Sequence, residues 1–192
     1  MGTSAKVLRA GDVRRLIMHA GYRRSGTRDQ IMVLLSFKAG LRACDIAGLD
    51  WTMVLRPDGC HGQHIAVADT IATGRSGRRV PIHPELKASL HKLHRQRGFP
   101  TVGAVIQSQR GGNMTARGVV NWFKQLYDEV GLEGCSSHSG RRTFITRSAR
   151  LLVRTGGSLR DIQELAGHRA LTTTERYIEG DRDAQRRLVR VL

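Results

Sequence analysis

Residues 27–40, TRDQIMVLLSFKAG, are almost wholly apolar after Gln30. Their length and composition predict a helix, and Gly40 is a usual residue at a helix C-terminus. A helix that is apolar on all sides must be covered on all sides by other elements. The sequence therefore predicts a buried central helix inside a mostly helical domain.

Further helices are predicted on both sides of this one. Residues 115–131 start at Thr115, a good capping residue, and carry an apolar stripe at helical spacing. The members of that stripe are Val119, Val120, Phe123, Leu126 and Tyr127. Helical patterns also cover residues 10–21, 84–98, 139–156, 158–168 and 171–181, and residues 184–192 are amphipathic and basic.

A small sheet is predicted between the helix at residues 27–40 and the helix at residues 84–98. Residues 41–54 suggest a short helix followed by a strand, and strands are expected again at 64–69 and 78–83. The turn RPDG and the glycine-rich TGRSG separate them. The prediction is one α+β domain, mostly helical, with a small three-stranded antiparallel sheet and no internal repeat.

The charge balance predicts a polyanionic partner. Lys and Arg number 32 against 16 Asp and Glu, a formal charge of +16 with a pI near 11.3. Nucleic acid is the commonest partner of such a chain. A membrane is the weaker choice, because no apolar run approaches about 20 residues and the N-terminus has no signal-peptide core. The expected location is the bacterial cytosol or nucleoid.

The cysteines predict no disulfide framework. Cys44, Cys60 and Cys135 are odd in number and far apart. The densest group of possible metal ligands, in CHGQH at residues 60–64, is interpreted as a solvated hairpin turn, because a site needs further ligands. His91 and His94 lie among Lys and Arg and are interpreted as basic surface. No metal is expected.

Five residues concentrate chemistry suited to phosphate: Arg42, His138, Arg141, His168 and Tyr177. Each has a structural explanation when taken alone, since Arg42 and His168 could cap helices and Tyr177 could be a core tyrosine. His138 and Arg141, however, stand one helical turn apart and could hold one oxyanion together.

Together, in this order, the five residues resemble the pattern R…H-x-x-R…[HW]…Y of the tyrosine recombinase family, also called the phage integrase family. The stretch GLRACDIAGLDW is similar to its first arginine box, with Asp45 where an acidic residue is usual. HSGRRTFIT resembles H-x-L-R-H-T-F, although Gly140 and Arg142 depart from the usual residues. LAGHRALTTTERY resembles L-G-H-x-x-x-x-T-T-x-x-Y and supplies His168 and Tyr177.

The resemblance extends over about residues 8–180 and implies a site-specific recombinase. Tyr177 would attack a DNA phosphodiester and leave a 3′-phosphotyrosine. Arg42 and Arg141 would bind the phosphate, His138 would accept a proton and His168 would donate to a phosphate oxygen. Asp45 would orient one of these groups. No cofactor is expected, since one phosphodiester replaces another and no ATP-binding loop or carboxylate cluster is present.

This sequence departs from the family pattern at a position that acts on the leaving group. The family usually has a lysine in the turn before R-x-V-P, where it is thought to protonate the leaving 5′ oxygen. Thr73 occupies that position here, and Arg75 is the nearest replacement. A guanidinium is a poor proton donor, so Arg75 is expected to contact phosphate or to act through its charge.

The resemblance also suggests assignments for the chain as a whole. Residues 1–180 would form the catalytic domain and residues 181–192 a basic tail that packs on a neighbouring subunit or on its own domain. The chain is similar to short members such as the fimbrial phase-switch invertases, or to an excised catalytic domain. The partner would be double-stranded DNA, bound by a monomer that forms a tetramer on paired sites, with accessory DNA-bending proteins. A DNA-binding relative with impaired catalysis, or a topoisomerase-like nicking and resealing enzyme, is the alternative.

Overall fold

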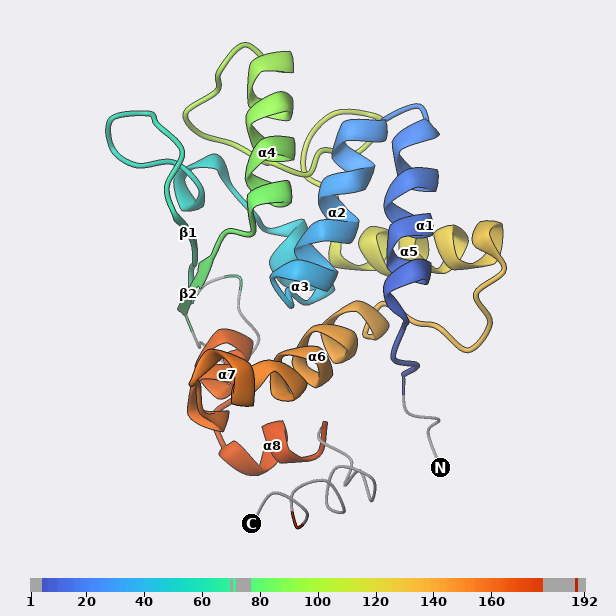
Figure 1. The fold of residues 1–192 in the computed structure, drawn as a ribbon. Helices are drawn as coiled ribbons and strands as arrows, with labels where there is room; N and C mark the ends of the chain where they lie inside the picture. Colours follow the sequence, from blue (N-terminus) through green and yellow to red (C-terminus); the bar gives the residue numbers. More distant parts are fainter. Residues whose placement is uncertain (1–4, 70, 72–76, 178–188, 190–192) are drawn as a thin grey trace.

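Eight α-helices, one 3₁₀ helix and two strands make up the part of the chain that the computed structural model describes, residues 5–69, 71, 77–177 and 189. In chain order they are α1 Ala10–Tyr22, α2 Gly26–Lys38, α3 Ala43–Ala47, η1 Trp51–Met53, β1 His64–Val67, β2 Arg78–Pro81, α4 Pro84–Gln96, α5 Ala116–Val130, α6 Ser139–Thr155, α7 Leu159–Ala166 and α8 Leu171–Glu175. Figure 1 shows α6, α7 and α8 grouped at one end of the molecule. The predicted mostly helical α+β class is confirmed.

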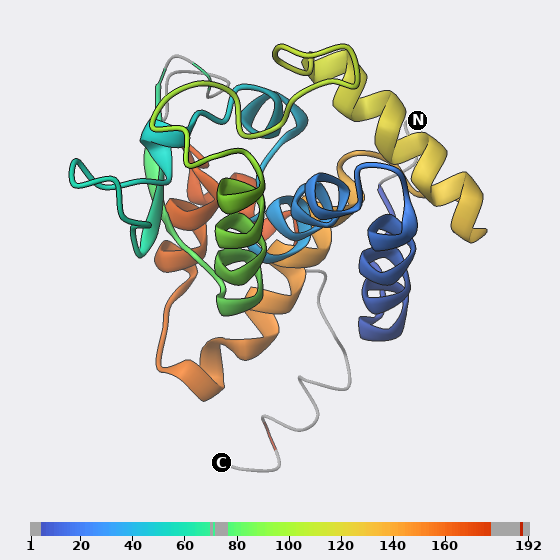
Figure 2. The ribbon, with the colours of Figure 1, turned by 90° about the horizontal axis from the view of Figure 1, so that it is seen from above.

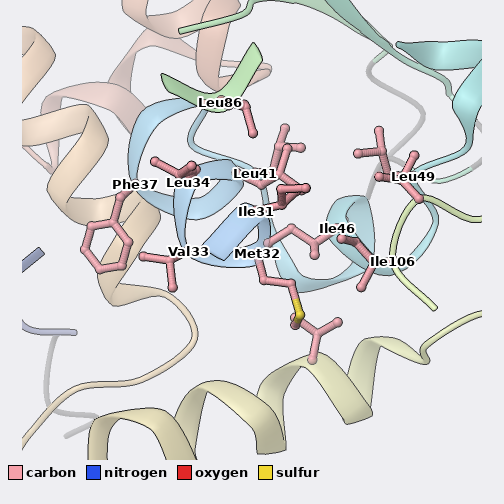
Figure 3. Close-up of a cluster of buried hydrophobic side chains, with 14 of the residues drawn as sticks. Ile31, Met32, Val33, Leu34, Phe37, Leu41, Ile46, Leu49, Leu86 and Ile106 are labelled. Atoms are coloured by element: carbon pink, nitrogen blue, oxygen red, sulfur yellow. The ribbon is translucent and has the colours of Figure 1, made fainter. Parts of the chain in front are cut away.

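Helix α2 is the buried centre of the fold, as its composition predicted. It packs against α1, α4 and α6, and Figure 2 shows it between α1 and α4. Ile31, Met32 and Leu35 have no solvent-exposed surface. Figure 3 shows side chains of α2 in one cluster with Ile46 of α3 and Leu86 of α4. This large core fixes the C-terminal end of α2, where the first arginine box begins.

Helix α5 has the predicted cap and most of the predicted stripe. The Thr115 hydroxyl accepts a hydrogen bond from the Gly118 amide at 3.0 Å, and Gly131 ends the helix in the left-handed conformation. Val120 was wrongly assigned to the stripe, since it is 40% exposed. Trp122 is buried instead, because it lies between Val119 and Phe123 on the inward face of the helix.

The sheet has two strands among the described residues, fewer than predicted. β1 and β2 are antiparallel, with Ile65 opposite Val80. The first predicted strand is replaced by η1, in which the Asp50 carboxylate accepts from the Thr52 amide at 3.0 Å, and the extended pairing there is reduced to isolated bridges from Asp50 and Leu55. This side-chain bond stabilises a turn in place of an extended backbone.

A second, smaller hydrophobic cluster holds the C-terminal helices together. Its fully buried members are Ile145, Ile162 and Ala166, from α6 and α7, and Phe144, Leu152 and Tyr177 pack partly against it. Across the described residues no helix is long and apolar enough to cross a membrane. Of the predicted tail at 181–192, all but Val189 lies outside those residues.

Candidate active site

Arg42 and Asp45 form the start of α3. Gly40 precedes them with a φ of +64°, and a side chain there would collide with the Phe144 ring of α6. The chain therefore turns sharply between α2 and α3 against α6. Asp45 is fully buried, and its carboxylate accepts a hydrogen bond from the Arg42 amide at 3.0 Å. This bond fixes the backbone from which the Arg42 side chain extends.

Arg78 is a site residue that the sequence did not predict. Its guanidinium is buried and donates to the Asp45 carboxylate at 2.8 Å and to the Leu165 carbonyl at 3.0 Å. Val80, two residues further along β2, is also buried, so the period of the strand directs Arg78 inward. That alternation was the available signal. Arg78 thereby joins the sheet to α3 and α7.

Arg141 extends into the interior from the first turn of α6. It is 3% exposed, and its two terminal nitrogens donate to the Gly40 carbonyl at 2.7 Å and the Ala166 carbonyl at 2.6 Å. Gly140 allows this turn to approach Ser36 of α2 more closely than any side chain would permit. Burial lowers the pKa of Arg141, and the like charges of Arg42 and Arg78 lower it further.

Two of these arginines have donors without an acceptor. Within the described residues, Arg42 Nη1 and Arg78 Nη1 are buried and have no hydrogen-bond partner. Buried polar groups are rarely left without a partner in folded proteins. Among the residues that the structure describes, the carboxylate bonded within this cluster is that of Asp45. The cluster of Arg42, Arg78 and Arg141, hereafter the arginine cluster, therefore has an excess of positive charge and free donors suited to an anion.

His168 lies beside the arginine cluster. Gly167 ends α7 in the left-handed conformation, and His168 follows with 9% of its surface exposed. Its Nδ1 lies 2.9 Å from the Thr174 hydroxyl oxygen. Burial lowers the pKa of His168 to about 4, and the charges of Arg141, Arg42 and Arg78 contribute. The imidazole is thus neutral near pH 7 and can still donate one N–H.

Tyr177 follows α8 and is half-buried. Its ring stacks on that of His168, with centroids 5.5 Å apart and planes inclined by 21°. The Thr146 hydroxyl donates to the Tyr177 carbonyl at 3.2 Å, and the Arg142 guanidinium lies 5.9 Å from the Tyr177 ring centroid. Residues distant in sequence are therefore brought together around the phenol.

His138 lies on a different side of the site from Arg141. It is exposed at the N-terminus of α6 and lines a pocket of about 450 Å³, whereas Arg141 is buried beneath. The pocket is lined by Ala5, Ser136, His138, Arg142, Thr173, Arg176 and Tyr177. Tyr177 therefore lines this pocket and stacks on His168, which lies beside the arginine cluster. Thr73 and Arg75 lie outside the described residues.

The histidines of the sheet region form a separate cluster. The His61 and His91 rings stack with centroids 3.7 Å apart, and His61 Nε2 lies 3.2 Å from His94 Nδ1. The interpretation of His94 as basic surface was wrong, since it is 5% exposed and packs on Trp51. In the described part of the chain, no three His, Cys, Asp or Glu side chains form a group that could hold a metal ion.

Known sequences resemble this chain over most of its length. The model of the phage integrase family matches residues 6–183. The tyrosine recombinase XerC of Leptospira interrogans is 29% identical over 157 residues, which are 80% of this chain and 47% of that protein. XerC of Nitrobacter winogradskyi is 30% identical over 78% of this chain and 45% of its own length. The chain thus spans about half the length of the curated relatives it matches.

Solved structures share the fold. A crystal structure of XerA recombinase superposes with a TM-score of 0.75 at 22% identity, over 97% of this chain and 63% of that one. The Tn1549 transposon integrase in complex with transposon right end DNA has a TM-score of 0.76 at 17% identity, over 100% of this chain and 67% of that one. A lambda integrase dimer bound to a core site has a TM-score of 0.67 at 18% identity, over 93% and 49%.

Proposed function

The chain belongs to the phage integrase family, and on this basis we propose that it is the catalytic part of a site-specific DNA recombinase. It would cleave and rejoin double-stranded DNA through a 3′-phosphotyrosine formed on Tyr177. The observation that carries this proposal is the pair of buried guanidinium nitrogens of Arg42 and Arg78 that have no partner among the described residues, in a cluster beside His168, whose ring stacks on that of Tyr177. A phosphodiester would supply the missing acceptor oxygens.

The arginine cluster would stabilise the reacting phosphate. Attack by an oxygen increases the charge on the two non-bridging oxygens, and fixed cationic donors lower the barrier when they are aimed at that charge. Asp45 and the carbonyls of Gly40 and Ala166 hold Arg78 and Arg141 in place before DNA binds. Because the donors are already oriented, little reorganisation is required during the reaction.

Two histidines would have separate tasks. In the tautomer in which Nδ1 accepts from the Thr174 hydroxyl, the His168 proton is on Nε2, which would donate to a phosphate oxygen. His138 shares the pocket with Tyr177, and a ring nitrogen of its imidazole can accept the phenol proton. Asp45 would act as a positioning residue for the Arg42 backbone and the Arg78 side chain.

The chemical step exchanges one ester for another. The Tyr177 oxygen forms a bond to phosphorus, its proton passes to His138 or water, and the bond from phosphorus to the 5′ oxygen breaks. The 5′ oxygen takes up a proton and later attacks the phosphotyrosine of a partner strand, which restores the tyrosine. No energy source is consumed. Since Thr73 stands where the family has a lysine, we infer that Arg75 stabilises the leaving oxygen by its charge and that water supplies the proton.

The DNA and subunit partners are part of the same proposal. Structures of the Tn1549 and lambda integrases contain DNA, and the +16 charge of this chain supports binding to a duplex. We propose a monomer that assembles into a tetramer on paired sites in the cytosol, with accessory DNA-bending proteins. Residues 1–180 would be the catalytic unit, and residues 181–192 would pack against a neighbouring subunit.

A nicked suicide duplex containing the cognate site tests the function. Wild-type protein should form a protein–DNA adduct that survives denaturation, while Tyr177→Phe should bind the duplex equally well and form none. Peptide mass spectrometry should locate the nucleotide on Tyr177. If wild type binds the duplex and yields no adduct, or yields one on another residue, the proposed function is wrong.

A further inference from the structure

The two adjacent arginines at the start of α6, Arg141 and Arg142, lie in different environments. Successive residues of a helix are about 100° apart, so adjacent side chains leave it in different directions. Arg141 enters the interior, whereas Arg142 is half-buried and lines the pocket that holds Tyr177. Only Arg141 has a counterpart in the family pattern, where the position of Arg142 is usually histidine. Arg142 therefore requires an explanation specific to this chain.

Arg142 and Thr146 hold the same tyrosine from one face of α6. They are four residues apart and thus lie one above the other on the helix. The Thr146 hydroxyl binds the Tyr177 backbone carbonyl, and the Arg142 guanidinium lies over the Tyr177 ring at 5.9 Å from its centroid. One helix face accordingly fixes both the backbone and the ring of the proposed nucleophile.

We propose that Arg142 is a positioning residue for the nucleophile, which holds the Tyr177 ring and favours the phenolate over the phenol during attack. This inference rests on the proposed function and extends it to a residue that the family pattern does not include. The charge on a phenolate spreads from the oxygen into the ring, so a cation over the ring stabilises it more than the neutral phenol. An arginine side chain supplies such a charge.

Single-turnover adduct formation at saturating DNA tests the charge. Arg142→Ala should slow the adduct about five- to tenfold, the factor that corresponds to one cation–π contact. Arg142→Lys should recover part of this loss. The matched control is Arg150→Ala, which removes one exposed positive charge from the same helix and should leave the rate within twofold of wild type.

Arg142→His distinguishes a charge effect from a steric one. Imidazole carries its charge only below about pH 6.5, so the ratio of this variant's rate to the wild-type rate should fall as the pH rises from 5.5 to 8.5. A residue that only packs against the ring would give a ratio that does not change with pH. Such a constant ratio, or an Arg142→Ala rate equal to wild type, would overturn the inference.

A measurement without DNA keeps the inference testable if no adduct forms. Tetranitromethane nitrates the phenolate form of tyrosine, and the chain contains an 87% exposed reference, Tyr22, and a 1% exposed one, Tyr127. In Arg142→Ala, nitration of Tyr177 relative to Tyr22 at pH 8 should fall about threefold or more. An unchanged or higher ratio would contradict the role of Arg142, whereas a missing wild-type adduct would contradict the recombinase function alone.

Discussion

The two sides of the proposed site are built on very different amounts of protein. Arg42 and Arg78 of the arginine cluster are attached to elements of the large core around α2 and are fixed by Asp45, which has no exposed surface. Tyr177 belongs to the small cluster, whose fully buried members among the described residues are Ile145, Ile162 and Ala166. Regions with few buried contacts open at lower free energy than the core. The comparison predicts that the proposed phosphate-binding side is the more rigid one and that the segment carrying the proposed nucleophile opens at a lower free energy.

Such a division suits strand exchange. The charges that bind a phosphate gain most from being fixed in advance. In the proposed reaction the tyrosine, in contrast, would have to reach the phosphorus, remain bonded to DNA and be released again. Thr146 and Arg142 hold it with contacts that can be broken and remade.

Replacing the buried Asp45 carboxylate should lower the stability of the arginine-cluster side of the site more than the other changes do. Asp45→Asn leaves the buried Arg78 guanidinium without its counter-charge, and we expect a loss of about 3–5 kcal/mol in the free energy of unfolding. Urea denaturation measures it. The double variant Asp45→Asn, Arg78→Met should recover part of the lost stability, because it leaves no uncompensated buried charge at this pair. A single-variant loss below about 1 kcal/mol would show that the pair does not stabilise this side.

Arg141→Ala tests whether the rigid side carries the catalysis. Loss of one preorganised donor should slow adduct formation about a hundred- to a thousandfold, or roughly 3–4 kcal/mol in the barrier. Circular dichroism and DNA affinity at matched salt serve as controls for folding. A slowing of less than tenfold in a folded variant would assign most of the barrier lowering to the other arginines.

Paired core truncations compare the two regions directly. Leu34→Ala in α2 should cost about 2–5 kcal/mol of global stability. Ile162→Ala should cost less overall, but it should increase amide hydrogen exchange mainly in α6, α7 and α8 and slow adduct formation. Equal protection of the α2 and α7 backbone amides from hydrogen exchange in the wild-type protein would show that the two regions do not differ in local stability.

Acidification should give the smallest effect. The pKa of His168 is lowered to about 4 in the folded protein and is about 6.5 when unfolded, so the unfolded chain binds more protons between these values. Stability should therefore decrease as pH falls from 6.5 towards 4, by a few degrees in Tm. His168→Gln should reduce this dependence without abolishing it, since burial also lowers the pKa of His61 to about 4. An identical dependence in His168→Gln would contradict the electrostatic account.

Local sequence patterns predicted the helices and their ends better than the contacts between residues of different helices and strands. The apolar run of α2 and the Thr115 cap of α5 depend on neighbouring residues and were readable from the chain. The candidate residues of the site were found through short motifs. Arg78 was missed because its partner Asp45 is 33 residues away, and only the fold brings them together. His94 was misassigned for the same reason, since the Trp51 ring that covers it comes from another segment.

The two carbonyls bound by Arg141 belong to different parts of the molecule. Gly40 follows the central helix, and Ala166 ends α7 in the small cluster, so one guanidinium fastens these parts to each other. Selection for a correctly folded protein would preserve this arginine in relatives with or without the proposed activity. Its presence in a related sequence is therefore a record of architecture, and the proposed activity has to be inferred from residues such as Tyr177, which lines the open pocket.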